Sequence, residues 1–359
     1  MNNMTQALAT QQTRTDNPRT NDPAVRPLAS PRALKNELPL PEALALQIDQ
    51  QRQQIRDCLS GADSRLLIIT GPCSIHDEAA VLDYGRRLAA LNEQLQDRML
   101  IVLRAYVEKP RTSIGWKGLA YDPARDGKGD MAAGIRRSRQ VMLQLAELGL
   151  PLATEALNPL VMAYLDDLVS WTAIGARTAE SQTHREMVSH LPMPVGIKNS
   201  TDGSAANAIN AMIAARHSHH TLGVDVDGQL AMLDTPGNPD THLVLRGGRG
   251  ITNYDTASIA EALATLKKGD CIEKVLVDCS HDNACKQHER QPLIARDVVA
   301  QRVAGNRGIL GLMLESFITA GRQNDGCDLT YGQSITDACI GWDETESLLR
   351  ELHSMLGGA

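Results

Sequence analysis

The sequence predicts an α/β fold, a TIM (β/α)8 barrel with an N-terminal extension and an inserted β-hairpin. Eight short apolar runs each end just before a residue that can bind a metal, an anion or a proton. Helical patterns separate these runs, and such an alternation is typical of a parallel sheet. The chain of 359 residues exceeds the roughly 250 residues typical of this barrel, which leaves room for added segments.

The polar residues that follow the apolar runs predict an active site. Parallel strands in a barrel point their C-terminal ends at one mouth, and the loops that carry catalytic groups leave from there. The runs and the residues after them are 65–70 before Cys73, 100–103 before Arg104, 150–154 before Glu155, 171–176 before Arg177, 193–197 before Lys198, 243–245 before Arg246, 275–277 before His281 and 309–314 before Glu315.

Helices are expected between the strands, where right-handed crossovers require them. Apolar residues spaced by three or four, such as Val81, Tyr84 and Leu88, give each helix one face for the barrel. The expected helices are 78–95, 134–148, 159–169, a short one near 179–189, 204–215, 256–266, 292–303 and 344–356.

Two segments do not fit the repeating unit. Residues 43–59 have a helical pattern, and residues 221–234 alternate like a hairpin around Asp227-Gly228, a dipeptide typical of a type I′ turn. We therefore expect a flexible arm at 1–35, a catalytic barrel at 36–359 and an inserted regulatory hairpin at about 218–237. Such additions serve assembly or regulation, or they are tolerated surface insertions.

Composition limits the classes of function. A net charge of −7 and a pI near 5.8 argue against a nucleic-acid surface, so any cations must be gathered in a cleft. No apolar stretch approaches the ~20 residues of a membrane span, and residues 1–32 lack the apolar core of a secretory signal. The seven cysteines have no paired spacing and are expected to be thiols. These features predict a cytoplasmic protein.

The segment at 71–77, Gly-Pro-Cys-Ser-Ile-His-Asp, predicts a metal site. Barrel closure brings Cys73 next to His281 and Glu315, and Asp337 can add a fourth ligand from the following loop. This set of ligands suits Mn, Fe, Co or Zn. Taken alone, Cys73 would be a buried structural thiol.

Two other metal assignments compete with this one. Cys279 shares a strand face with His281 and could be a second inner thiol. A histidine cluster at 217–220 is a rival by composition, although its place in a loop favours an exposed surface.

Cations at the strand ends predict a ligand with several negative charges, such as a phosphate ester or a phosphoenol compound. Lys109, Arg111 and Thr112 follow Arg104 on a loop stiffened by Pro110 and could hold a second phosphate. A basic loop that only contacts solvent is the alternative. Small residues beside cations form phosphate nests, as expected for Ala176 with Arg177, for Lys198-Asn199 and for Arg246-Gly247-Gly248.

Together these motifs resemble class I 3-deoxy-D-arabino-heptulosonate 7-phosphate (DAHP) synthase over about residues 65–356. The motifs are Gly-Pro-Cys-Ser-Ile-His-Asp at 71–77, Lys-Pro-Arg-Thr at 109–112, Gly-Ala-Arg-Thr at 175–178, Arg-Gly-Gly at 246–248, Ser-His at 280–281 and Ser-Ile-Thr-Asp at 334–337. The resemblance implies the first step of the shikimate pathway, in which phosphoenolpyruvate condenses with erythrose 4-phosphate and inorganic phosphate is released.

The resemblance also implies roles for individual residues. Cys73, His281, Glu315 and Asp337 would bind the divalent metal. Arg104, Lys109, Arg177, Lys198 and Arg246 would bind phosphoenolpyruvate, and Lys109, Arg111 and Thr112 would line the erythrose 4-phosphate site. Lys109 is the first candidate for protonating the new alkoxide, with metal-bound water and Glu155 as alternatives.

The resemblance further implies an aromatic amino acid effector and a homodimer or homotetramer. In this family the N-terminal arm and the hairpin help to form the inhibitor site and the subunit contacts. Pro192 and Thr221 depart from the common pattern near the expected effector pocket, so Phe, Tyr and Trp stay open. The related 3-deoxy-D-manno-octulosonate 8-phosphate synthase and a non-catalytic regulator are the alternative functions.

Overall fold

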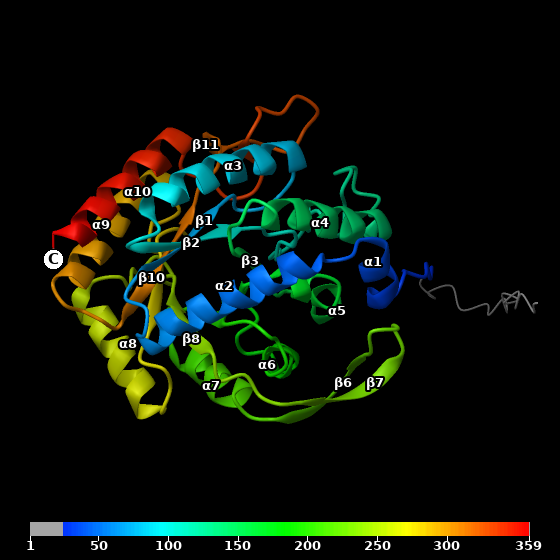
Figure 1. Ribbon diagram of the computed structural model, residues 1–359, viewed down its shortest axis with the longest axis horizontal. Helices are drawn as coiled ribbons and strands as arrows, with labels where there is room; N and C mark the ends of the chain where they lie inside the picture. The colour runs from blue at the N-terminus through cyan, green and yellow to red at the C-terminus, as the bar shows by residue number, and fades with distance from the viewer. Residues whose placement is uncertain (1–23, 359) are drawn as a thin grey trace, which may run out of the picture.

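Eight parallel strands form a closed barrel in the computed structural model, which describes residues 24–358 (Figure 1). Around the barrel the strands follow the order β1-β10-β9-β8-β5-β4-β3-β2. The barrel strands are β1 (Leu66–Gly71), β2 (Met99–Arg104), β3 (Leu152–Glu155), β4 (Trp171–Ile174), β5 (Val195–Lys198), β8 (Thr241–Leu245), β9 (Val275–Asp278) and β10 (Ile309–Glu315). The predicted TIM barrel is therefore confirmed.

Helices cover the outside of the barrel, as the sequence predicted (Figure 1). They are α3 (Glu78–Leu95), α4 (Met131–Ala146), α5 (Pro159–Met162), α6 (Gln182–Val188), α7 (Ala206–Ala215), α8 (Thr256–Lys268), α9 (Gln291–Val303) and α10 (Trp342–Gly357). Short elements lie in the loops: the 3-10 turns η1 (Asp166–Leu168) and η2 (His288–Arg290), and the paired strands β11 (Thr319–Arg322) and β12 (Gln333–Ser334).

The helix predicted at 159–169 is wrong beyond Met162, where α5 ends and only the short turn η1 follows. Backbone carbonyls in this segment accept hydrogen bonds from arginines of other helices instead of continuing a helix. Arg139 donates to the Tyr164 carbonyl, and Arg52 donates to the carbonyls of Asp166 and Val169. Tertiary contacts therefore override the local helical pattern here.

Two N-terminal helices precede the barrel, α1 (Pro31–Glu37) and α2 (Glu42–Ser60). Helix α1 occupies residues for which a flexible arm was predicted, so that prediction is wrong for residues 31–35. The remainder of the predicted arm falls mostly on residues 1–23, which lie outside the described residues.

Helix α2 closes the N-terminal end of the barrel, a role that the sequence did not reveal. Its Ile55, Cys58 and Leu59 belong to the same apolar cluster as the inward-facing side chains of the strands. Its polar side chains contact segments just before strands: Gln51 donates to the Gly149 carbonyl, and Arg56 donates to the Pro192 carbonyl. The opposite, C-terminal mouth of the barrel stays accessible.

The inserted hairpin is present as β6 (His219–Val224) paired antiparallel with β7 (Leu230–Thr235). The predicted type I′ turn is wrong. A type I′ turn needs a left-handed backbone at both central residues, but of Asp227 and Gly228 only Gly228 has one, with φ 79°. Instead, the Asp225 carboxylate accepts hydrogen bonds from the Asp227 and Gln229 backbone N–H groups, which stabilises a longer turn.

The hairpin tip lies beside α1 (Figure 1), where the Arg32 backbone N–H donates to the Val226 carbonyl. No helix within residues 24–358 has both the length and the apolar character needed to span a membrane.

A buried polar pair sits inside the barrel. Trp171 Nε1 donates to His242 Nε2 over 2.9 Å, and both side chains are completely buried. A Cβ at Gly196 would lie 2.3 Å from the Trp171 ring, so a glycine is needed beside it. Burial lowers the pKa of His242 to about 4, and the imidazole is therefore neutral at physiological pH.

The His242 pair predicts a component of acid instability. Because the folded pKa is depressed, the unfolded chain binds a proton first as the pH falls below about 6.5. Between pH 7.5 and pH 5 the wild type should lose about 2 kcal/mol more of its free energy of unfolding than His242→Gln does. The glutamine keeps an acceptor for Trp171 but cannot be protonated. Urea unfolding at both pH values measures this difference. Equal losses in the two proteins would contradict the prediction.

Candidate active site

A pocket of about 540 Å³ opens at the C-terminal mouth of the barrel. Most of its lining comes from the strand ends and from the loops that follow them, as expected for this fold. The predicted site residues that line it are Lys109, Arg111, Thr112, Glu155, Ala176, Arg177, Lys198, Arg246, His281 and Asp337. The other three, Cys73, Arg104 and Glu315, are buried.

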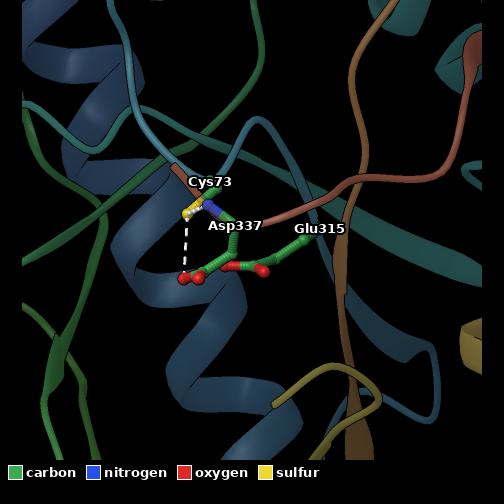
Figure 2. A group of neighbouring side chains, drawn as sticks. All are labelled: Cys73, Glu315 and Asp337. Atoms are coloured by element: carbon green, nitrogen blue, oxygen red, sulfur yellow. Dashed lines mark hydrogen bonds between the residues drawn. The ribbon is translucent and has the colours of Figure 1, made fainter. Parts of the chain in front are cut away.

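Three of the four predicted metal ligands form one group. Ligand atoms of Cys73, Glu315 and Asp337 all lie within 4.8 Å of one another (Figure 2). Cys73 Sγ is 3.4 Å from Asp337 Oδ2 and accepts a hydrogen bond from the Asp337 backbone N–H. Metal bonds of about 2.0–2.3 Å place two donors of one ion at most about 4.6 Å apart, so this group is close to the required spacing.

His281 lies outside this compact group, although its ring lines the same pocket. Its Nδ1 is 2.9 Å from Asp278 Oδ2 but is not aligned for a hydrogen bond with any described residue. A metal-binding histidine commonly turns one ring nitrogen to a carboxylate and uses the other as the ligand. The arrangement suits such a role, and His281 as the fourth ligand stays a prediction.

Lys109 is held against the metal-type ligands. Its Nζ donates to Cys73 Sγ over 3.0 Å and to the Cys73 carbonyl over 3.2 Å. Burial alone would lower the pKa of Lys109, but the Cys73 sulfur and the Glu315 and Asp337 carboxylates outweigh it and raise the pKa above its usual range. Lys109 therefore carries a proton at neutral pH.

Arg104 does not line the pocket but supports it from below. The guanidinium is 1% exposed, donates to Glu315 Oε1 over 3.2 Å and stacks over the Tyr106 ring at 4.0 Å. The Ser280 hydroxyl donates to the other oxygen of Glu315. Both carboxylate oxygens of Glu315 are thus held in place, and the phosphoenolpyruvate contact predicted for Arg104 stays a prediction.

The other strand-end cations are also oriented by neighbours. Lys198 Nζ donates to Asp278 Oδ2 over 2.9 Å, and Arg246 donates to Asp282 over 2.6 Å. Arg177 donates to the Thr112 hydroxyl over 3.2 Å, which joins the loops after β4 and β2. These contacts keep the cations extended toward one pocket despite their mutual repulsion.

Glu155 reaches the pocket because its neighbour has no side chain. A Cβ at Gly175 would lie 2.4 Å from Glu155 Oε1. Beside the phosphate nest predicted for the Gly-Ala-Arg-Thr segment, the structure shows a second reason for its glycine, since Gly175 makes space for a carboxylate.

A profile of the DAHP synthetase I family matches residues 44–350. The chain belongs to this family. A Tyr-sensitive phospho-2-dehydro-3-deoxyheptonate aldolase of Escherichia coli K12 is 50% identical over 334 residues, covering 92% of this chain and 94% of the relative. A Trp-sensitive phospho-2-dehydro-3-deoxyheptonate aldolase of Escherichia coli O6:H1 is 46% identical over 343 residues, covering 95% of this chain and 98% of the relative.

A solved structure of the phospho-2-dehydro-3-deoxyheptonate aldolase from Francisella tularensis SCHU S4 has a closely similar fold. Its TM-score is 0.92 at 37% sequence identity, and the match covers 94% of this chain and 99% of that chain. The identity and the coverage agree with membership of the DAHP synthetase I family.

Some pocket residues of this DAHP synthetase I chain were not found from the sequence. Lys286 and His288 follow His281 on the same loop, Arg322 ends β11, and Asp278 lies behind the pocket. The position of Lys286 and His288 after β9 was a usable signal. Arg322 gave none, because it lies in the long segment after β10 rather than at the end of a barrel strand.

The competing metal assignments receive no support from the geometry. Cys279 is fully buried, has its Sγ 3.8 Å from the Val277 carbonyl and is not part of the ligand group. In the histidine cluster, His219 contacts the Ala214 carbonyl and His220 contacts Asp234. Among the described residues these histidines join no metal-type group.

Proton release should accompany metal binding at Cys73. Burial and then the Glu315 carboxylate raise the pKa of the Cys73 thiol to about 12, so the metal-free thiol is protonated. Because a metal binds the thiolate, we expect about one proton per ion to appear when metal-free protein is titrated with Zn²⁺ in weak buffer at pH 7.5.

Cys58→Ser is the matched control for this titration. Burial raises the pKa of Cys58, in α2, to about 12 as well. The control should release the same proton as the wild type, whereas Cys73→Ser should not release it. Stoichiometric binding by the wild type without proton release would contradict the prediction.

Proposed function

We propose that this protein is a 3-deoxy-7-phosphoheptulonate synthase that condenses phosphoenolpyruvate with D-erythrose 4-phosphate, yielding DAHP and phosphate. The observation that carries the proposal is the group of Cys73, Glu315 and Asp337 beside a pocket lined by cations. Both substrates carry several negative charges, and only a site with fixed positive charges binds them together. The reaction is the first step of the shikimate pathway.

The cations divide between the two substrates. Arg177, Lys198 and Arg246 would bind the phosphate and the carboxylate of phosphoenolpyruvate, with the small Ala176 allowing a close approach and Arg104 acting from beneath. Arg111 and Thr112, on the loop after β2, would hold the phosphate of erythrose 4-phosphate. Arginine forks match two phosphate oxygens, whereas lysine supplies a point charge or a proton.

A divalent ion, Mn, Fe, Co or Zn, would be held by Cys73, His281, Glu315 and Asp337. A metal at this position supplies a Lewis acid that polarises the aldehyde oxygen. The protein side chains then have two tasks, which are to align C3 of phosphoenolpyruvate with the aldehyde carbon and to move protons.

Lys109 is the proposed proton donor to the alkoxide that forms when the new carbon–carbon bond is made. Its protonated Nζ lies beside Cys73, between the ligand group and the phosphate-binding loop. Water then adds at C2 and phosphate leaves, and Glu155, which lines the pocket, would accept the proton of that water.

Replacing Lys109 tests this assignment. General acid catalysis contributes typically 10²–10⁴-fold, so we expect Lys109→Met to lower kcat by about 10³-fold. The loss of phosphoenolpyruvate absorbance in the presence of erythrose 4-phosphate and Mn²⁺ measures turnover. Lys128→Met is the control, because Lys128 is an exposed lysine paired with Asp126. Near-normal turnover of Lys109→Met would exclude the role.

The same assay tests the function as a whole. Metal-stripped wild-type protein should consume phosphoenolpyruvate only when both erythrose 4-phosphate and a divalent metal are added. No consumption with any of the four metals would reject the proposed reaction.

We further propose feedback inhibition by an aromatic amino acid. Relatives of this chain are named Tyr-sensitive or Trp-sensitive, and the Tyr-sensitive relative has the higher identity of the two, 50% against 46%. Tyrosine is therefore the effector to test first, with Phe and Trp in parallel assays. Suppression of turnover by one of them is expected, and no response to any of the three would contradict the proposal.

We also propose that the protein works in the cytoplasm as a homodimer or homotetramer. The hairpin supports association, because Leu222, Leu230 and Met232 expose between 71% and 76% of their surface. Apolar side chains gathered on one projecting element are typical of a protein interface.

A further inference from the structure

Asp278 lies between a residue of the proposed phosphoenolpyruvate site, Lys198, and a residue of the proposed metal site, His281. It is the last residue of β9 and is completely buried. Its Oδ2 accepts a hydrogen bond from Lys198 Nζ over 2.9 Å and lies 2.9 Å from His281 Nδ1. Its Oδ1 accepts from the Ser280 backbone N–H over 3.0 Å. The bond to Oδ1 therefore fixes the orientation of the carboxylate, while Oδ2 faces both Lys198 and His281.

The two neighbours do not share that oxygen equally. Lys198 makes an aligned hydrogen bond to it, whereas His281 Nδ1, at the same distance, has no hydrogen-bond partner among the described residues. A buried nitrogen without a partner is costly, because it has lost its contact with water. A small turn of the ring would bring the Nδ1–H of His281 into line with Oδ2, whose negative charge Lys198 partly neutralises.

The backbone at His281 supports a positioning role. Its φ is 52°, in the left-handed region that residues other than glycine rarely adopt. Such conformations persist where the surrounding structure requires them, often at functional sites.

We propose that Asp278 is a positioning residue that couples phosphoenolpyruvate binding to metal binding through its shared carboxylate oxygen. The inference rests on the proposed function, in which Lys198 binds phosphoenolpyruvate and His281 binds the metal. When the substrate draws Lys198 toward its own oxygens, Lys198 no longer neutralises Oδ2, and Oδ2 attracts the Nδ1–H of His281 more strongly. That hydrogen bond makes the other ring nitrogen a stronger metal ligand.

Coupling of this kind is reciprocal. Phosphoenolpyruvate should tighten metal binding, and the metal should tighten phosphoenolpyruvate binding by the same factor. In the wild-type protein we expect a factor of about 5 or more, at the lower end of typical coupling. Titration of metal-free protein with Mn²⁺, followed by the signal of free Mn²⁺ in electron paramagnetic resonance, measures the affinity with and without saturating phosphoenolpyruvate.

Asp278→Asn is the informative variant. It keeps the shape of the side chain but removes the negative charge that would attract the Nδ1–H of His281 once Lys198 is drawn away. Metal affinity with saturating phosphoenolpyruvate should fall more than metal affinity without it, so that the effect of phosphoenolpyruvate on metal affinity falls to within about twofold of unity.

Asp282→Asn is the matched control, since it removes a carboxylate from the cation Arg246 rather than from Lys198. It should weaken phosphoenolpyruvate binding. The ratio of the metal affinities with and without saturating phosphoenolpyruvate should stay that of the wild type. If Asp278→Asn kept that ratio too, the coupling would be a direct attraction between the substrate anion and the metal, and the proposal would be overturned.

A second measurement needs no substitution at Asp278. In metal-free wild-type protein with ¹⁵N-labelled histidine, phosphoenolpyruvate should shift the Nδ1 resonance of His281, which His281→Gln identifies. An unmoved resonance overturns the proposal even if Asp278→Asn does not fold. Wild-type turnover with erythrose 4-phosphate distinguishes this failure from failure of the proposed reaction, because an active enzyme without coupling rejects the inference alone.

Discussion

Parallel pairing of β1 with β10 closes the barrel, and the candidate metal site depends on that closure. Gly71 pairs with Glu315, and the Ser316 backbone N–H donates to the Gly71 carbonyl. Cys73, two residues after Gly71, thereby meets a carboxylate from the far end of the chain. Gln291, at the start of α9, donates to the Glu315 carbonyl and accepts from its N–H, which fixes the strand end.

Charges in this site are compensated before any substrate arrives. Arg104 is paired with Glu315, Lys198 with Asp278 and Arg246 with Asp282. Burial of an unpaired charge is costly, so each pairing lets a cation stay near the pocket without unfolding its strand end. In the proposed coupling, an anionic substrate competes for these cations, so that binding at one part of the site affects another.

The added segments have different physical roles. Helix α2 is part of the fold, because its apolar face completes the barrel interior and its polar side chains contact the segments before the strands. The hairpin contributes little to the barrel and leaves four large apolar side chains exposed, those of Leu222, Val226, Leu230 and Met232. Sequence periodicity could identify both segments but could not assign these roles, since packing partners lie far away along the chain.

By itself, the sequence determined the barrel, the order of its strands and most of the residues at its mouth. Strand and helix periods are local properties, and parallel closure sends every strand end to one side. Tertiary structure alone decided the early end of α5, the turn of the hairpin, the burial of Arg104 and the place of Asp278 between Lys198 and His281. These features depend on contacts between residues distant in sequence, which no local pattern encodes.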